Sequence, residues 1–197
     1  PIGEGIFCVI PDGTGAGTSW LNALGSIQEA VDRAYASGGG EVWVKAGLYT
    51  GAGACVVDIP DGVKVYGGFS GGETQRNQRD YITNFTGING ESERRCVSGG
   101  NGIVLDGFAI GNGKSPDGLG AGLYVDGDDA TVANCQFIAN AAAGPACTAL
   151  LGQKADPGKG AAVYSSGNYF QIHECMFRNN SAKGGTGTYC TGGDAFG

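Results

Sequence analysis

The chain has 197 residues, of which 40 are glycine and only 6 are proline, and its formal net charge is −7. Collagen would need glycine at every third position, and a disordered chain would not combine 41% hydrophobic with 16% charged residues, so we expect a folded protein with many turns. The negative charge without a basic run argues against a nucleic-acid partner, and no apolar stretch is long enough to insert into a membrane. Because the chain starts at Pro1, we expect a processed form or a piece of a longer protein.

The first clear element in chain order is a helix over residues 26–36. Ser26 and Glu29 have the spacing of a capping box, and Ser-Gly-Gly-Gly at 37–40 ends the pattern. One apolar face follows the spacing i, i+3, i+4, i+7, formed by Ile27, Ala30, Val31 and Ala34. A strand is expected next, at 41–45. A helix in this place would cover the open apolar end and the unpaired edge of the strands that follow.

An internal repeat dominates the second half of the chain. Residues 118–157 and 158–197 align over 40 positions without a gap. Each copy begins with two short strand-like runs and ends in an inserted loop. Such a unit cannot bury its own apolar face, so it must stack on its neighbours. The matched pairs include Tyr124 with Tyr164, Cys135 with Cys175, Phe137 with Phe177, and Asn140 with Asn180.

These segments resemble a known group of proteins. Residues 26–32 followed by 41–49 are similar to the amino-terminal cap and first coil of right-handed parallel β-helix proteins of the pectate-lyase-like superfamily. Residues 61–84 resemble a segment of bacterial secreted and cell-surface β-helix proteins, and the 40-residue units are similar to repeats of polymorphic outer-membrane adhesins. The resemblance implies an all-β fold, a right-handed parallel β-helix (solenoid) with an N-terminal capping α-helix, forming a single domain over 1–197. It does not single out an activity, because the superfamily contains lyases, hydrolases, adhesins and structural modules.

Seven cysteines indicate an oxidising compartment, so we expect a secreted or cell-surface protein. Cys135 and Cys175 should stack one above the other, and we favour a ladder of free thiols over a bridge, because side chains in register suit a disulfide poorly. Cys147 and Cys190 belong to the two inserted loops and are the best disulfide candidates. An odd total leaves at least one thiol free or linked to another chain.

Candidates for chemistry are few. Asp126, Asp128 and Asp129 form the one local acidic cluster, a weak Ca²⁺ candidate for which a solvated acidic turn is the favoured interpretation. His173, the single histidine, is expected on the surface. Since no carboxylate and base are brought together by their spacing, no catalytic, cofactor-binding or other metal-binding residue is assigned, and an enzyme is the less favoured interpretation.

Asparagines offer two further predictions. Asn140 and Asn180 are expected to form a stacked amide ladder at a turn, each side chain bonding to its neighbour. Asn84 and Asn179 begin sequons, which matter only in a source that glycosylates them.

Two functions of different class follow. The first is an extracellular structural or adhesive module that self-associates through its coil ends, head to tail, into a fibre or surface layer, or that binds a cell-surface or glycan partner. The alternative is a carbohydrate-active protein, either a polysaccharide lyase or a glycan-binding module, that uses a groove along one face.

Overall fold

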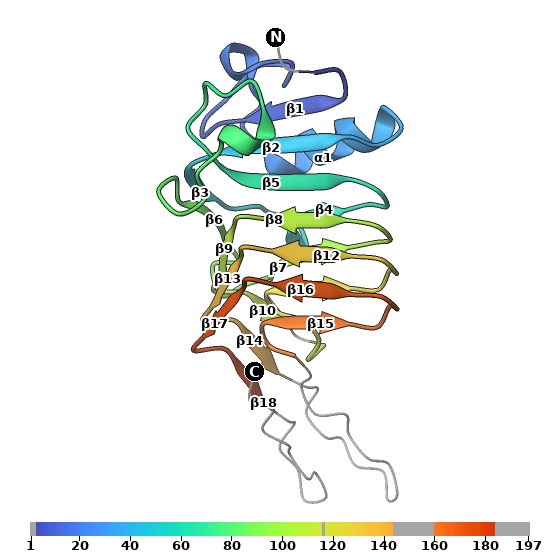
Figure 1. Ribbon diagram of the computed structural model, residues 1–197. Coiled ribbons are helices and arrows are strands. Elements are labelled where there is room, and N and C mark those ends of the chain that lie inside the picture. Colours follow the sequence, from blue (N-terminus) through green and yellow to red (C-terminus); the bar gives the residue numbers. More distant parts are fainter. Residues whose placement is uncertain (1–2, 116, 144–159, 184–197) are drawn as a thin grey trace, which may run out of the picture.

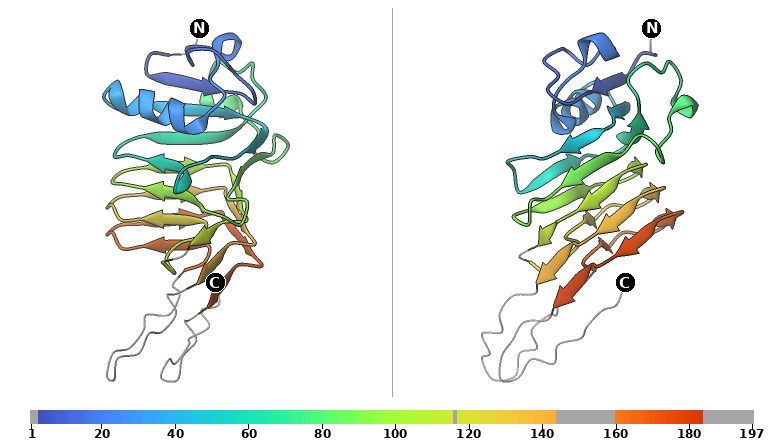
Figure 2. Two further views of the ribbon diagram at one scale, coloured as in Figure 1. Left: turned by 180° about the vertical axis from the view of Figure 1, so that it is seen from behind. Right: turned by 90° about the vertical axis from the view of Figure 1, so that its left-hand side faces the viewer.

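The structure is a computed structural model that describes residues 3–115, 117–143 and 160–183 (Figure 1). Short strands lie in successive layers along an elongated column, with α1 near the N-terminal end (Figures 1 and 2). Helix α1 spans Ile27–Ala36, and the 3-10 helices η1 and η2 span Trp20–Asn22 and Arg76–Gln78. No helix in the described residues is long and apolar enough to cross a membrane.

The strands of the described residues form four parallel sheets, named here A to D. In spatial order, sheet A contains β1 (Ile6–Val9), β2 (Glu41–Lys45), β5 (Lys64–Phe69), β8 (Val104–Asp106), β12 (Thr131–Ala133) and β16 (Gln171–His173). Sheet B contains β3 (Gly47–Tyr49), β6 (Thr86–Asn89), β9 (Ala109–Gly111), β13 (Gln136–Ile138) and β17 (Met176–Arg178). Sheet C contains β4 (Cys55–Ile59), β7 (Arg95–Gly99), β11 (Leu123–Val125) and β15 (Val163–Ser165), and sheet D contains β10 (Lys114–Ser115), β14 (Ala141–Ala143) and β18 (Ser181–Lys183).

The predicted fold class, an all-β right-handed parallel β-helix solenoid, was wrong: the strands belong to four separate sheets beside one α-helix, and in the described residues no sheet closes or coils. The corners supply the reason. Asn134 lies between β12 and β13 at φ 52°, and Ala139 lies between β13 and β14 at φ 54°. A single left-handed residue turns the chain sharply and interrupts the backbone hydrogen bonds. What the sequence presents as one coil is therefore divided among different sheets.

The 40-residue offset recurs in the strand register. Leu123 pairs with Val163, and Gln136 pairs with Met176, so each pair joins positions 40 residues apart. Residues 144–159 and 184–197, which include the predicted inserted loops, lie outside the described residues. We call the strands β15 to β18 the end layer, and β11 to β14, directly above it in Figure 1, the inner layer.

Helix α1 forms where the sequence predicts it. The Ser26 side chain accepts a hydrogen bond from the Glu29 backbone N–H at 3.3 Å, which satisfies one of the free donors at the helix start. Its buried face packs on β1, β2 and β4. The apolar ends of sheets A and C are thus covered on the N-terminal side of the column.

The core lies between the sheets. Its central residues, such as Leu105, Ile110 and Phe137, are fully buried. A smaller cluster of alanines includes Ala142 and Ala182. A third cluster is formed by side chains of sheet A: the rings of Trp43 and Phe69 stack with centroids 4.8 Å apart, and the Trp20 ring packs against them.

Candidate functional site

The segment of residues 70–85 leaves the column between β5 and β6 and is held back against it by charged side chains. Arg79 makes an ion pair with Asp106 of β8 at 2.6 Å, and it also donates to the carbonyl oxygen of Gly67 at 3.0 Å. Both charged side chains are largely buried, with 10% and 15% of their areas exposed. The segment therefore forms a fixed wall beside sheet B.

Glu73 organises the start of this segment. Its carboxylate accepts hydrogen bonds from the backbone N–H groups of Ser70, Gly71 and Gly72 at 2.6–2.9 Å. Burial alone would raise the pKa of Glu73, but these hydrogen bonds outweigh burial and lower it. The carboxylate has the role of a turn cap, which agrees with a structural function for the charged segment.

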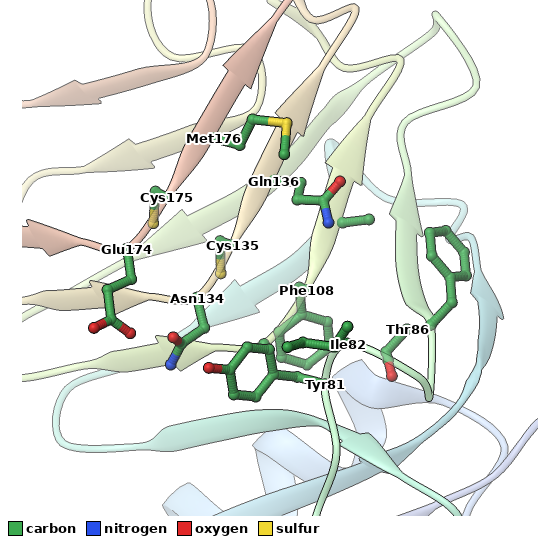
Figure 3. A pocket seen from close by; sticks show the side chains of 13 residues that line it. Tyr81, Ile82, Thr86, Phe108, Asn134, Cys135, Gln136, Glu174, Cys175 and Met176 are labelled. Carbon is green, nitrogen blue, oxygen red and sulfur yellow. The ribbon is translucent and has the colours of Figure 1, made fainter.

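A groove of about 260 Å³ opens between this wall and sheet B (Figure 3). Its floor comes from β9 and the corner before it, and the residues after β12 and β16 form its far side. Glu174 is the one carboxylate among the described residues that line it, and no lysine or arginine is among them. The side chains labelled in Figure 3 are Tyr81, Ile82, Thr86, Phe108, Asn134, Cys135, Gln136, Glu174, Cys175 and Met176.

Cys135 and Cys175 lie side by side at this groove, in adjacent layers (Figure 3). Each follows a corner residue with positive φ, and the strands after them pair in register. Their surroundings differ, because Cys135 is buried with 1% exposure whereas Cys175 is half-buried. Both are free thiols, so the structure places the predicted pair as stacked thiols and not as a bridge.

The two thiols have opposite acidities. Burial raises the pKa of Cys135 well above its ordinary value. Hydrogen bonding from the Cys135 thiol lowers the pKa of Cys175 to about 7, against the effect of partial burial. The remaining described cysteines have no such partner, and burial raises the pKa of Cys8 and of Cys96 to about 12. Cys175 is therefore the described cysteine with the greatest thiolate fraction near neutral pH.

Asn140 and Asn180 are joined at the corner between sheets B and D. The Asn140 side-chain amide donates to Asn180 Oδ1 at 2.9 Å and to the Ile110 carbonyl oxygen at 3.0 Å. Its own Oδ1 accepts from the backbone N–H of Gly113 at 2.9 Å. The Asn180 amide continues the pattern by donating to the Phe137 carbonyl oxygen at 2.9 Å. The result is a ladder that links three layers.

A second ladder, which the sequence analysis missed, runs along the turns before sheet A. Asp61 accepts from the backbone and side chain of Asn101, whose own Oδ1 accepts from the backbone N–H of Asp128. Asp128 in turn accepts from the backbone of Asn168 at 2.6 Å. The signal was present, since both an Asp61–Asn101 and an Asp128–Asn168 match occur at an offset of 40 residues.

This ladder bears on the weak calcium candidate. Asp128 already accepts hydrogen bonds from Asn168, and Asp129 is a corner residue at φ 59°. Within the residues that the structure describes, no group of three or more His, Cys, Asp or Glu side chains, Asp126 included, could hold a metal ion. The hydrogen bonds of Asp128 fit the interpretation as an ordered acidic turn.

The end layer exposes side chains that the inner layer buries. Phe177 is 40% exposed, while Phe137, which stacks on it at 5.3 Å, is fully buried. Ile172 is likewise 40% exposed, and its partner in the register, Val132, is fully buried. Met176 adds a further apolar side chain, 52% exposed.

The other predicted residues are placed as follows. His173 lies on β16 and is exposed. Asn84 donates its amide to the Gly68 carbonyl oxygen at 3.1 Å, whereas Asn179 is an exposed corner residue at φ 57°. Cys147 and Cys190 lie outside the described residues. Within residues 3–115, 117–143 and 160–183, the structure brings none of the aspartates of the weak calcium candidate together with a base.

Searches of protein-family models, curated proteins and solved structures find no match to this chain. The resemblance to the pectate-lyase-like superfamily therefore stays a prediction from the sequence.

Proposed function

We propose that the protein is an extracellular structural or adhesive module whose end layer is its surface for self-association with a second copy. The observation that carries the proposal is the exposure of Ile172 and Phe177, whose partners in the layer above, Val132 and Phe137, are fully buried. Met176 adds a third exposed apolar side chain beside them. Fully burying one such side chain contributes about 1.5–3 kcal/mol, so covering this layer is favourable.

The backbone of the end layer supports strand pairing. In β16 and β17, alternate residues pair with the layer above: the backbone N–H groups of Gln171 and Met176 donate to the Ala130 and Cys135 carbonyl oxygens at 2.9 Å. In a parallel strand the intervening residues direct their N–H groups to the other side, where the end layer has no strand among the described residues. Such an edge is a template for a further strand.

The proposed occupant is the end layer of a second copy. Head-to-tail stacking, expected from the sequence, would bring the end layer against the N-terminal side, where α1 covers β2 and β4 and exposes polar residues such as Glu29 and Asp32. Contact of two end layers instead joins two equally apolar edges and is self-complementary. The secreted or cell-surface location is part of the proposal and rests on the cysteine content.

Sedimentation velocity over a wide concentration range tests this proposal. With rising concentration, we expect the measured mass to increase from that of one chain, 19.8 kDa, to twice that value and then to stay constant. Ile172→Lys, which places a charge in the contact, should weaken the association by at least about tenfold, whereas the control Ile82→Lys should not, because Ile82 is 83% exposed on the segment of residues 70–85. A mass that stays at one chain throughout would overturn the proposal, and unlimited growth would support the head-to-tail fibre instead.

Glycan binding is a second candidate, favoured by a specific feature of sheet B. Phe85 is 57% exposed beside a shallow groove of about 210 Å³, floored by Gly87 and Gly111 and edged by Asn89 and Asn112. An aromatic face with amide groups nearby suits a sugar ring. Titration with neutral and acidic oligosaccharides, followed by nuclear magnetic resonance, tests it: shifts lost in Phe85→Ala support binding, and no shifts at millimolar ligand contradict it. Unsaturated products, detected by ultraviolet absorbance, would indicate a lyase.

A further inference from the structure

We propose that Cys175 is a nucleophilic thiol that exchanges with small disulfides entering the groove of Figure 3. Cys135 is the positioning residue that keeps the Cys175 sulfur reactive. This inference concerns the groove and does not depend on the proposed self-association. Three observations carry it: the access of Cys175 to the groove, the buried second thiol next to it, and the charge of the groove.

Access distinguishes Cys175 from the thiol above it. Cys175 is half-buried and lines the groove, while Cys135 is closed off by the layers on both sides. Sulfur exchange needs the attacking atom to approach the disulfide directly, so only Cys175 of this pair can react with an external molecule.

The neighbouring groups keep the Cys175 sulfur reactive. The buried Cys135 thiol holds its proton beside Cys175 and lowers the pKa of Cys175, which favours the thiolate. The Cys135 Sγ also donates to the Leu105 carbonyl oxygen at 3.7 Å, which fixes its position. Two carboxylates oppose formation of the thiolate. One is Asp106 of β8, whose charge Arg79 largely neutralises by its ion pair, and the other is Glu174, the residue before Cys175. The remaining titratable neighbours are Tyr81, from the wall of the groove, and His173, whose carbonyl oxygen lies 3.3 Å from Cys175 Sγ.

The reaction is balanced without a cofactor. The Cys175 thiolate attacks one sulfur of R–S–S–R, a new Cys175–S–S–R bond forms, and the original S–S bond breaks. The electron pair of that bond leaves with RS⁻, which takes a proton from water. The Cys135 thiol is too weakly acidic to displace the second RS⁻ readily, so we expect the mixed disulfide to accumulate.

The groove favours one class of disulfide. Glu174 supplies its carboxylate, and no lysine or arginine is among the described lining residues. Asn134 and Gln136 offer amide groups, and Met176 and Ile82 offer apolar surface. A small disulfide with ammonium groups is therefore expected to react faster than one with carboxylates.

The experiment compares two disulfides on dilute protein: cystamine, a dication, and DTNB, a dianionic aromatic disulfide. Peptide mass mapping measures how fast each cysteine is modified. Wild-type Cys175 should react with a pH midpoint near 7, rising with pH as the thiolate forms. Cys96, which is buried, should stay unmodified in the same samples and serves as the internal control. When each rate is divided by the rate of the same reagent with a free small thiol, which removes the difference in leaving group, cystamine should be favoured over DTNB by at least about threefold at low salt. Glu174→Gln should remove this preference.

Variants of Cys135 test its role. Cys135→Ala should move the pH midpoint of Cys175 upward toward the ordinary value of about 8.5, whereas Cys135→Ser, which keeps a donor, should hold it near 7. Circular dichroism checks that each variant is folded, and the serine variant keeps the test valid if the alanine variant is not. The proposal would be overturned if wild-type Cys175 reacted no faster than Cys96, or with a midpoint near 8.5. An unchanged midpoint in folded Cys135→Ala would overturn the role of Cys135.

Discussion

The inner and end layers carry matching residues at matching positions, yet the residues behave differently. Phe137 and Phe177 stack face to face, but only Phe137 is enclosed. Cys135 holds its proton, and Cys175, 40 positions later, is the more acidic thiol. Because the paired side chains are the same, the difference comes from the neighbouring layers: among the described residues, the inner layer has one on both sides and the end layer has one on a single side. In this structure, the repeat places matching residues in register, and the layers around each residue decide its exposure and its pKa.

The largest effect is expected from truncating the paired phenylalanines. Phe137→Ala should lower the free energy of unfolding by about 3–5 kcal/mol, since it opens a cavity in a closed core. Phe177→Ala should cost only about 1–2 kcal/mol, because part of that ring already contacts water. Urea unfolding of dilute protein measures both. Equal losses would contradict the claim that the layers differ in enclosure.

The asparagine ladder gives the next effect. Asn140→Ala should leave the buried Gly113 N–H without a partner and remove the side-chain bond to the Ile110 carbonyl oxygen, at about 1–3 kcal/mol in all. Asn180→Ala should cost about 1 kcal/mol, because Asn180 is only half-buried and water can replace its bonds. Urea unfolding again serves as the measurement, with Asn77→Ala, at an exposed residue of η2, as the control. A greater loss for Asn180→Ala would reverse the expected order.

The turn ladder is expected to give the smallest effect. Asp128→Ala removes exposed hydrogen bonds to Asn168 and should cost about 0.5–1.5 kcal/mol. Added Ca²⁺ should leave the thermal midpoint of the wild-type protein unchanged, because Asp128 is engaged in the ladder. A calcium-dependent rise in midpoint that disappears in Asp128→Ala would instead establish a metal site.

Local patterns in the sequence predicted the parts of the fold that depend on nearby residues. The capping box at Ser26 and Glu29 and the apolar spacing after it are signals within one helix, and α1 lies where they indicate. The 40-residue offset predicted that Cys135 lies beside Cys175 and Asn140 beside Asn180, since matching positions in stacked units come into register.

The remaining features depend on backbone conformation and distant segments. Ala139 and Glu174 adopt positive φ, which neither residue type favours, so no residue pattern marks these corners or the division into four sheets. The groove arises because Arg79 reaches Asp106, 27 residues away, and fixes Tyr81 opposite Cys175. Its thiol chemistry could not be predicted from spacing, since the two matching cysteines differ only in what covers them.

Amide hydrogen exchange at two protein concentrations tests most directly the claim that the end layer differs only by having no layer below it in the described part of the chain. At low concentration, residues 171–183 should exchange much faster than residues 131–143. At high concentration, residues 171–183 should become protected, while residues 131–143 stay unchanged. Equal protection of the two segments in dilute protein would contradict the difference between the layers, and fast exchange of residues 171–183 at every concentration would contradict their burial by a second copy.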